Sequence, residues 1–353
     1  MRQQLNFQWY LPANCWWLYF RCRSAFYGPA SLLRYNTGGT YGRGNEWYCS
    51  GGTGCPNNLQ ISNNTVLNVP NGVIFGNGQI QGNLTIDAGS AMYMDYGSPG
   101  QNQVIEVYKD VILNGSLSLG DAIGGDLHVK GNWTKDAAAT FNSNSRAVIF
   151  NGSTADQTIT GATTFGYLIL NKSTGNLLLT NNVSCNNGLT LTSGKIVLGA
   201  NDLSLTALAP SSLSAGSSTS YVVTDGAGAF KRGVGTVFTG QDYHFPVGTL
   251  SAIQSATINF NTLATDNSLA ARFITGPAGN AGLPFTEGSD NIVRVANNGY
   301  WEVNLASGTT NGYNERHTCC HNWFQCTGCF AAYRNERLLT VCRRWRKSYF
   351  FTG

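Results

Sequence analysis

Charge is scarce in this sequence. Only 11% of the 353 residues are Asp, Glu, Lys or Arg, whereas a quarter is usual. Exposed helix faces normally carry many charges, so the deficit argues against a mostly helical enzyme. Long apolar runs are also missing, and no stretch reaches the eighteen or more apolar residues of a membrane-spanning helix. We therefore expect no membrane-spanning segment.

Glycine and aromatic residues are abundant instead. The chain has 43 glycines and 12% aromatic residues, a balance that suits strands and tight turns. Its 42% of apolar residues can build a sizeable core. The composition predicts an all-β protein.

Basic residues, cysteine and tryptophan gather at the two ends. Residues 57–313 hold ten Lys or Arg against fifteen Asp or Glu, and a single cysteine, Cys185. The net charge of +4 therefore describes no basic nucleic-acid-binding surface, and we expect no nucleic-acid partner. The ends, 1–56 and 314–353, show neither alternation nor helical periodicity and read like out-of-frame translation. We expect a poorly patterned N-terminal flank without an intact signal peptide, and a C-terminal flank that is disordered or out of frame.

Short apolar pairs recur through the first half of the middle region. The pairs are Leu84/Ile86, Ile105/Val107, Leu127/Val129, Val148/Phe150, Leu168/Leu170 and Leu189/Leu191, and their first members are evenly spaced along the chain. Each pair has the two-residue strand period, and turn residues follow it at once. This pattern predicts a parallel β-solenoid over 57–209 with one coil of about 21 residues per repeat. Before Leu84 the register is lost, so Ile61 to Phe75 is expected to form an irregular cap.

The Asn-Gly pairs of this region would ordinarily suggest antiparallel hairpins, but hairpins require no constant repeat. A Ser-rich stretch, 210–220, is expected to be a linker. Beyond it, strands of uneven spacing separated by Gly, Pro and Asn predict an antiparallel β-sandwich over 221–313. We expect this sandwich to be truncated, because its pattern breaks near Tyr313.

The middle region also resembles a known group of proteins. The succession GNWTKDAAATFNSNSRAVIFNGSTADQTITGATTFGYLILNKSTGNLLLTNNVSCNNGLTLTSGKIVLGANDLSLT, followed by SYVVTDGAGAF and HFPVGT, resembles the large secreted repeat proteins of Bacteroidota, over roughly Gly54 to Tyr313. These are similar to filamentous-haemagglutinin-type adhesins. The resemblance implies a right-handed β-helix, a following β-sandwich and export to the cell surface. A type IX secretion sorting domain, usual in the group, is not recognised here, which suggests a fragment.

Few residues of the sequence suggest chemistry. In the C-terminal flank, His317, Cys319, Cys320, His321, Cys326 and Cys329 have spacings that a zinc site could use, but they lie in the segment interpreted as mistranslated. The middle region has two histidines. His128 is expected to face solvent, and Asp242 beside His244 lacks an accompanying nucleophile motif. Cys185 is expected at a core or turn position, and we predict no catalytic, metal or cofactor site.

Enzymatic activity is the main alternative, because right-handed β-helices also host polysaccharide lyases and glycosidases. Their chemistry needs paired carboxylates, or a base beside charge-neutralising cations. The candidates are Asp95, Glu106, Asp110, Asp121, Asp126 and Asp136, with Lys109 and Lys130. Glu106 and Asp126, one coil apart, could lie on adjacent rungs. The simpler interpretation is a set of solvated charges on the outer face.

The sequence as a whole predicts an extracellular or surface-displayed β-solenoid followed by a β-sandwich. Its expected function is that of a non-catalytic adhesin or structural repeat protein that presents a rigid polar surface to glycans or to host and matrix surfaces.

Overall fold

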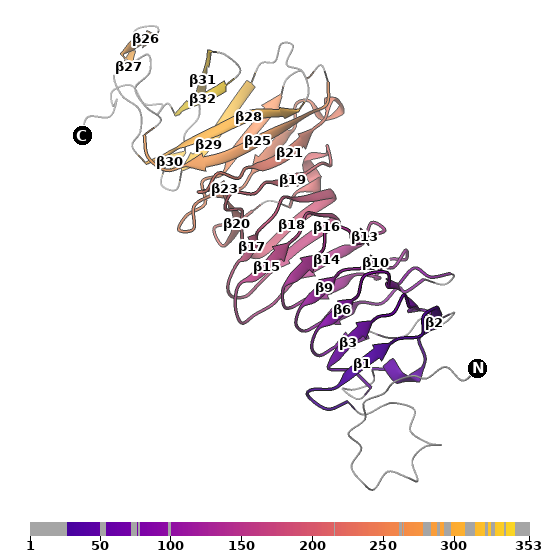
Figure 1. The fold of residues 1–353 in the computed structure, drawn as a ribbon. Coiled ribbons are helices and arrows are strands. Elements are labelled where there is room, and N and C mark those ends of the chain that lie inside the picture. Colours follow the sequence, from indigo (N-terminus) through magenta and orange to yellow (C-terminus); the bar gives the residue numbers. More distant parts are fainter. Residues whose placement is uncertain are drawn as a thin grey trace, which may run out of the picture. The chain divides into compact units, whose positions relative to one another are not determined.

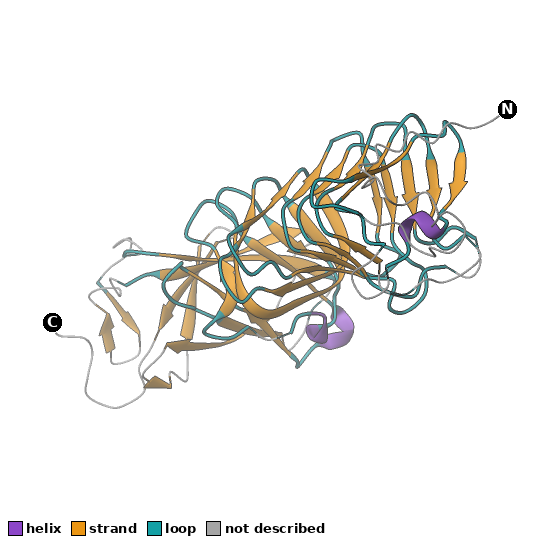
Figure 2. Ribbon diagram, turned by 90° about the horizontal axis from the view of Figure 1, so that it is seen from below, coloured by secondary structure: helices purple, strands orange, loops and turns teal. Residues whose placement is uncertain are grey.

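The computed structural model describes residues 27–342, except 50–53, 72–75, 77, 98–99, 215, 261–262, 264, 278–283, 288–289, 293–297, 308–314, 322–323, 326–328 and 335–336. The chain divides into two compact units, 1–194 and 195–353. Strands dominate both units, as the composition predicts (Figures 1 and 2). The helical segments in the described residues are three-residue 3-10 turns, and no helix there has the length and apolar character of a membrane-crossing segment.

The first unit is a β-solenoid built from parallel ladders, as predicted (Figure 1). Each complete coil contributes one strand to each of three faces. The first face contains β1 (Leu32–Tyr35), β3 (Asn58–Ile61), β6 (Leu84–Ile86), β9 (Val111–Leu113), β12 (Trp133–Lys135), β15 (Gln157–Thr160) and β17 (Leu177–Leu179). The second face contains β2 (Thr40–Gly42), β4 (Val66–Asn68), β7 (Ala91–Tyr93), β10 (Ser116–Ser118) and β13 (Thr140–Asn142).

The third face completes each coil. It contains β5 (Gly78–Ile80), β8 (Ile105–Val107), β11 (Leu127–Val129), β14 (Ala147–Phe150) and the later parts of β16 (Thr163–Asn171) and β18 (Val183–Val197). Every pairing between these strands is parallel. The hairpin alternative is therefore excluded for this unit, because hairpin strands pair antiparallel.

Alternating side chains build the core of the solenoid. On β11, Leu127 and Val129 are fully buried, while His128 between them points outward and is half-buried. Leu168 and Leu170 repeat this pattern two coils later. Equivalent side chains stack from coil to coil, so each coil covers the apolar surface that its neighbour could not bury alone. Each buried leucine or valine contributes about 1.5 to 3 kcal/mol by leaving water.

One apolar pair of the predicted repeat, Leu84/Ile86, does not belong with the others. Leu84 lies on the first face and pairs with Val111, whereas the remaining pairs lie on the third face. The true partner of Ile105 is Gly78, and Ile80 stands opposite Val107. The error arose because a long connection between β7 and β8 places β8, on another face, one repeat length after β6. From Ile105 onward the register of the third face follows the predicted spacing.

Parallel pairing also reaches further toward the N-terminus than residue 57. Leu33 and Tyr35 on β1 are buried and pair with Leu59 and Ile61 on β3. The segment from Ile61, predicted as an irregular cap, instead continues into β4, which pairs in register with β2 and β7. The described part of the N-terminal flank thus has the same alternation and stacking as the later coils.

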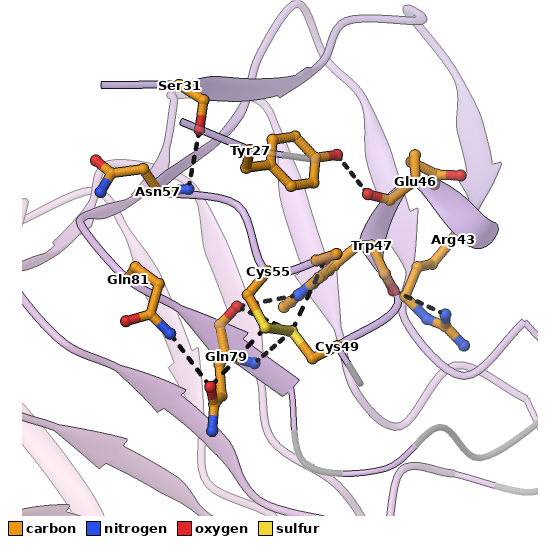
Figure 3. The surroundings of a disulfide bond; sticks show 11 residues. Tyr27, Ser31, Arg43, Glu46, Trp47, Cys49, Cys55, Asn57, Gln79 and Gln81 are labelled. Atoms are coloured by element: carbon orange, nitrogen blue, oxygen red, sulfur yellow. Dashed lines mark hydrogen bonds between the residues drawn. A yellow bond between two sulfur atoms is a disulfide. The ribbon is translucent and has the colours of Figure 1, made fainter. Parts of the chain in front are cut away.

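A disulfide covers the open edge of the third face (Figure 3). Cys49 and Cys55 are bonded, and Cys49 Sγ accepts a hydrogen bond of 3.3 Å from the backbone N–H of Gln79 on β5. The indole Nε1 of Trp47 donates to the Gln79 carbonyl at 3.3 Å. Because β5 pairs with β8 on its other side, these contacts satisfy backbone groups that an exposed edge strand would leave open. We call Trp47, Cys49 and Cys55 the N-terminal cap.

The second unit combines parallel and antiparallel pairing. Its parallel ladders join β19 (Leu203–Leu205) to β21 (Phe230–Val234), and β20 (Ser220–Val223) to β23 (Val247–Gly248). Parallel ladders therefore extend beyond residue 209, where the sequence pattern had ended the solenoid. Within the predicted linker, Pro210–Ser212 forms a 3-10 turn, and Leu213 and Ser220 are buried.

Antiparallel strands follow in this unit, as the β-sandwich prediction requires. β25 (Asn267–Ile274) lies between β21 and β28 (Tyr300–Ser307), and β24 (Ala256–Phe260) lies between β22 (Asp242–Phe245) and β29 (Glu315–His321). β31 (Cys329–Arg334) pairs with β32 (Arg337–Cys342), and β26 (Phe285–Glu287) pairs with β27 (Asp290–Ile292). β30 (Phe324–Gln325) pairs with β29. The strands of the C-terminal flank thus join this antiparallel system.

Candidate functional site: a groove on the second face of the solenoid

The connection between the second and third faces varies strongly in length along the first unit. It spans 69–77, 94–104 and 119–126 in three successive coils, and 143–146 in the next. In the two coils after that, one continuous strand, β16 and then β18, passes through this corner, and a register shift leaves only Gly166 and 186–187 unpaired. We call these segments the corner loops. In repeat architectures such insertions collect on one side of the molecule, often the binding side.

A groove lies where the long corner loops give way to the short ones. Its volume is about 440 Å³, and its lining comes from β7, β10, β13 and the corner loop that follows β7. The lining residues are Tyr93, Asp95, Tyr96, Ser116, Leu117, Ser118, Thr140 and Asn142. Seven of these eight side chains carry a polar group.

Strand register aligns the floor of the groove. Ser118 stands opposite Tyr93 on one side and opposite Asn142 on the other, while Ser116 stands opposite Thr140. Neighbouring strands lie about 4.8 Å apart, so this polar row extends about 10 Å across three coils. The Thr140 hydroxyl donates to Ser116 Oγ at 2.7 Å, which leaves the Ser116 hydroxyl hydrogen free to point elsewhere.

Two tyrosines form one wall of the groove. The rings of Tyr93, at the end of β7, and Tyr96, in the corner loop, stack with centroids 6.4 Å apart and planes inclined by 22°. Tyr96 is 38% exposed. An exposed ring beside polar hydroxyl and amide groups combines an apolar contact surface with hydrogen-bonding partners, as small-molecule sites do.

A hydrogen-bond network fixes the carboxylate of Asp95. Its Oδ2 accepts bonds from Ser118 Oγ and from Asn144 Nδ2, both at 2.7 Å. The Asn144 amide also donates to Ser118 Oγ at 3.1 Å and to the Leu119 carbonyl at 2.8 Å. The backbone of Asn144 is left-handed (φ +47°), a conformation that Asn tolerates better than most residues. Among the described residues, no donor contacts Oδ1 of Asp95.

The other candidate carboxylates lie elsewhere in the solenoid and serve local structure. The carboxylates of Asp110, Asp126 and Asp136 accept hydrogen bonds of 2.7 to 2.8 Å from the backbone N–H groups of Asn132, Ala147 and Ala138. Asp121 lies beside Gly100, where a Cβ would contact its carboxylate. The carboxylate of Asp126 accepts a hydrogen bond from the N–H of Ala147, and the strand register places His128 rather than Asp126 opposite Glu106.

Glu106 instead faces basic groups on the third face. Its carboxylate lies 3.5 Å from Lys130 Nζ and 3.7 Å from His128 Nδ1, and Lys130 Nζ lies 3.5 Å from the centre of the Tyr108 ring. Burial lowers the pKa of His128, while the charges of Glu106 and Asp126 act in the opposite direction. His128 is thus less solvated than its position in the alternating pattern had predicted. Lys109 is not a member of this cluster.

His244 and Asp242 both lie on the exposed side of β22 but bind different partners. His244 Nδ1 is 2.9 Å from Thr257 Oγ1, and Asp242 Oδ1 accepts a bond of 2.8 Å from Asn259 Nδ2. The structure therefore brings the two together only as neighbours on one strand. Cys185 is fully buried, as predicted, and burial raises the pKa of its thiol well above the ordinary value.

The Cys- and His-rich cluster of the C-terminal flank is described at the level of its backbone. His317 on β29 pairs with Cys329 on β31. Cys326 and the side chains of this cluster lie outside the described residues. Within the part of the chain whose side chains are described, no three His, Cys, Asp or Glu residues come together as a metal site would require.

Sequence reasoning named only Asp95 from the residues of the groove. Tyr93, Tyr96 and Asn144 carried no recognisable motif, because the groove and its network combine residues from three stacked coils. The spacing of the apolar pairs gave no signal of the corner loops, because the pairs recur evenly while the loops between the second and third faces differ in length. No protein-family model matches the chain, and no match was found among curated proteins or among solved structures.

Proposed function

We propose that this protein is a non-catalytic, exported structural repeat protein that binds glycans through the second-face groove. The observation that carries the proposal is the stacked pair of half-buried Tyr93 and exposed Tyr96 beside an aligned row of hydroxyl, amide and carboxylate groups. Sugars present apolar C–H faces and many hydroxyls, so they match a site that offers both ring surface and hydrogen-bonding groups. A stiff solenoid would hold such a site at a fixed distance from its attachment point.

Two further features support an exported, surface-displayed role. The Cys49–Cys55 disulfide suits an oxidising compartment, where such bonds persist. The resemblance of the middle region to secreted Bacteroidota repeat proteins points the same way. Both concern where the protein would act, whereas the groove concerns what it would bind.

The enzyme alternative finds less support in the groove. Glycosidases place two carboxyl groups about 5 to 10 Å apart across the scissile bond. Among the eight residues that line this groove, Asp95 is the one carboxylate, and its Oδ2 already accepts two hydrogen bonds. A general acid paired with a second carboxylate would need a residue that the described lining lacks.

A binding and turnover screen on the same immobilised polysaccharides tests the proposal. We expect retention of the protein without release of new reducing ends or unsaturated sugars. Tyr96→Ala should weaken retention about tenfold, corresponding to about 1.4 kcal/mol. Tyr167→Ala is the matched control, because Tyr167 is similarly exposed (41%) on the third face, away from the groove lining. Equal losses in both variants, or turnover that depends on Asp95, would overturn the proposal.

A further inference from the structure

We infer that the second-face groove selects neutral glycans over glycans that carry carboxylate or sulfate groups. The inference rests on the proposed function and adds the chemical class of the ligand. It follows from three features of the groove: its charge, the direction of its hydrogen-bonding groups and the nature of its ring wall.

The charge of the groove comes from one residue. Asp95 is the charged member of the lining, and the groups that bind its carboxylate, Ser118 and Asn144, are neutral. Its negative charge therefore lacks a cationic partner within the groove. A carboxylate or sulfate placed there would meet like charge at short distance, where partial burial reduces the screening by solvent.

Two basic residues close to the groove in sequence, Arg146 and Lys130, do not line it. Arg146 is the last residue of the corner loop 143–146, and its Nε donates to the backbone carbonyl of Asn144 at 3.4 Å. Lys130 lies beside β11 of the third face and pairs with Glu106. Neither residue lines the groove, so neither would offset the charge of an acidic sugar.

The hydrogen-bonding groups favour sugar hydroxyls. Oδ1 of Asp95 is an acceptor without a described donor, and an acceptor of this kind binds a hydroxyl but repels another oxyanion. Ser116 presents a hydroxyl hydrogen on the same floor, since Thr140 already donates to its oxygen. A neutral sugar has adjacent hydroxyls that can donate to Asp95 and accept from Ser116 together.

The ring wall adds contact surface that does not depend on charge. Tyr93 and Tyr96 present nearly parallel planes, against which the flat C–H face of a pyranose ring can pack. This contact contributes equally to a neutral chain and to its charged derivative. Discrimination between the neutral chain and its charged derivative must therefore come from Asp95. Selectivity can thus be tested separately from glycan binding.

Matched polymers with one backbone provide the test. We would measure retardation of the full chain by hydroxyethyl cellulose and carboxymethyl cellulose, and by dextran and dextran sulfate, in affinity electrophoresis at about 0.15 M salt. The variants are Asp95→Asn, Tyr96→Ala and Arg146→Gln. For the backbone that binds, we expect the neutral polymer to bind at least tenfold more tightly than its charged derivative. Asp95→Asn should reduce that ratio to about threefold or less, and Tyr96→Ala should weaken both polymers while preserving the ratio.

The outcomes separate the inference from the proposed function. Tyr96-dependent binding that is equal or tighter for the charged polymer would overturn neutral selectivity and leave glycan binding in place. Binding of the charged polymer that disappears in Arg146→Gln would overturn it too, by assigning recognition to that cation. If no polymer shows Tyr96-dependent binding, the proposed function fails and the inference falls with it.

Discussion

The first unit contains two kinds of coil that share one core. Coils around β7 and β10 carry long corner loops, whereas coils around β16 and β18 turn from the second to the third face almost at once. Ile105 in the first group and Leu168 in the second are both fully buried and belong to the same stacked row. The difference therefore lies outside the core: the short coils supply a regular scaffold, and the long coils add the groove.

The outer row of the third face shows the same contrast. From β5 to β18 it reads Gln79, Glu106, His128, Ile149, Ile169 and Thr190. Within this row, the ionisable residues stand beside the long corner loops. The ionisable side chains are thus concentrated in the coils with long corner loops, although the backbone pairing is the same in all coils. The following predictions compare the coils with long loops and the coils with short loops.

Core substitutions should affect both kinds of coil alike. Ile105→Asp and Leu168→Asp each place a charge in the stacked core and should lower the free energy of unfolding by about 4 kcal/mol or more. Ile169→Asp is the control, because Ile169 neighbours Leu168 but faces outward. Thermal melts would measure the three variants. Comparable losses for Ile169→Asp and Leu168→Asp would contradict the assigned alternation.

The N-terminal cap should stabilise the long-coil end. Cys49→Ser removes a cross-link that closes a short loop, which costs about 2 kcal/mol. It also removes the sulfur that accepts the Gln79 N–H. Relative to the wild type, Cys49→Ser should accelerate backbone hydrogen exchange at β5 more than at β14. Adding a reductant should reproduce this effect in the wild-type chain and leave Cys49→Ser unchanged; an additional loss in the variant would implicate another cysteine.

Asn144 should hold the groove together across coils. Asn144→Gly keeps the left-handed backbone accessible but removes the amide that binds Asp95, Ser118 and Leu119, so we expect a loss of about 1 to 2 kcal/mol. Asn144→Ala should cost about 1 kcal/mol more, because it adds backbone strain. Chemical denaturation would measure both variants. Equal stability of Asn144→Gly and wild type would contradict a stabilising role for this network.

The smallest effect concerns pH. Burial lowers the pKa of His128 below its ordinary 6.5, so the unfolded chain binds a proton more readily than the folded one near and below that pH. Stability should therefore rise as the pH increases toward 6.5 and level off above it, with a change below about 1 kcal/mol. His128→Gln should remove this component. A variant that retains the full pH dependence would place its origin elsewhere than at His128.

Predictability differed between scaffold and site. The alternation at Leu127, Val129, Leu168 and Leu170 is local, so it revealed both strands and stacking. Leu84 was misplaced because a regular spacing along the chain does not state which face a strand joins. The groove escaped detection for a related reason: Tyr93, Ser118 and Asn142 are each a full coil apart in sequence, and the backbone register alone makes them neighbours.

The sequence by itself determined an all-β chain, the solenoid over most of its length and the antiparallel strands that follow, because these depend on short-range alternation and turn residues. Only the tertiary structure decided the exact pairing of the early coils, the covering of β5 by Trp47 and Cys49, and the groove around Asp95. Those features depend on backbone hydrogen bonds between coils and on loops of unequal length. Residues distant in the chain become neighbours there through stacking, and no local pattern records that relation.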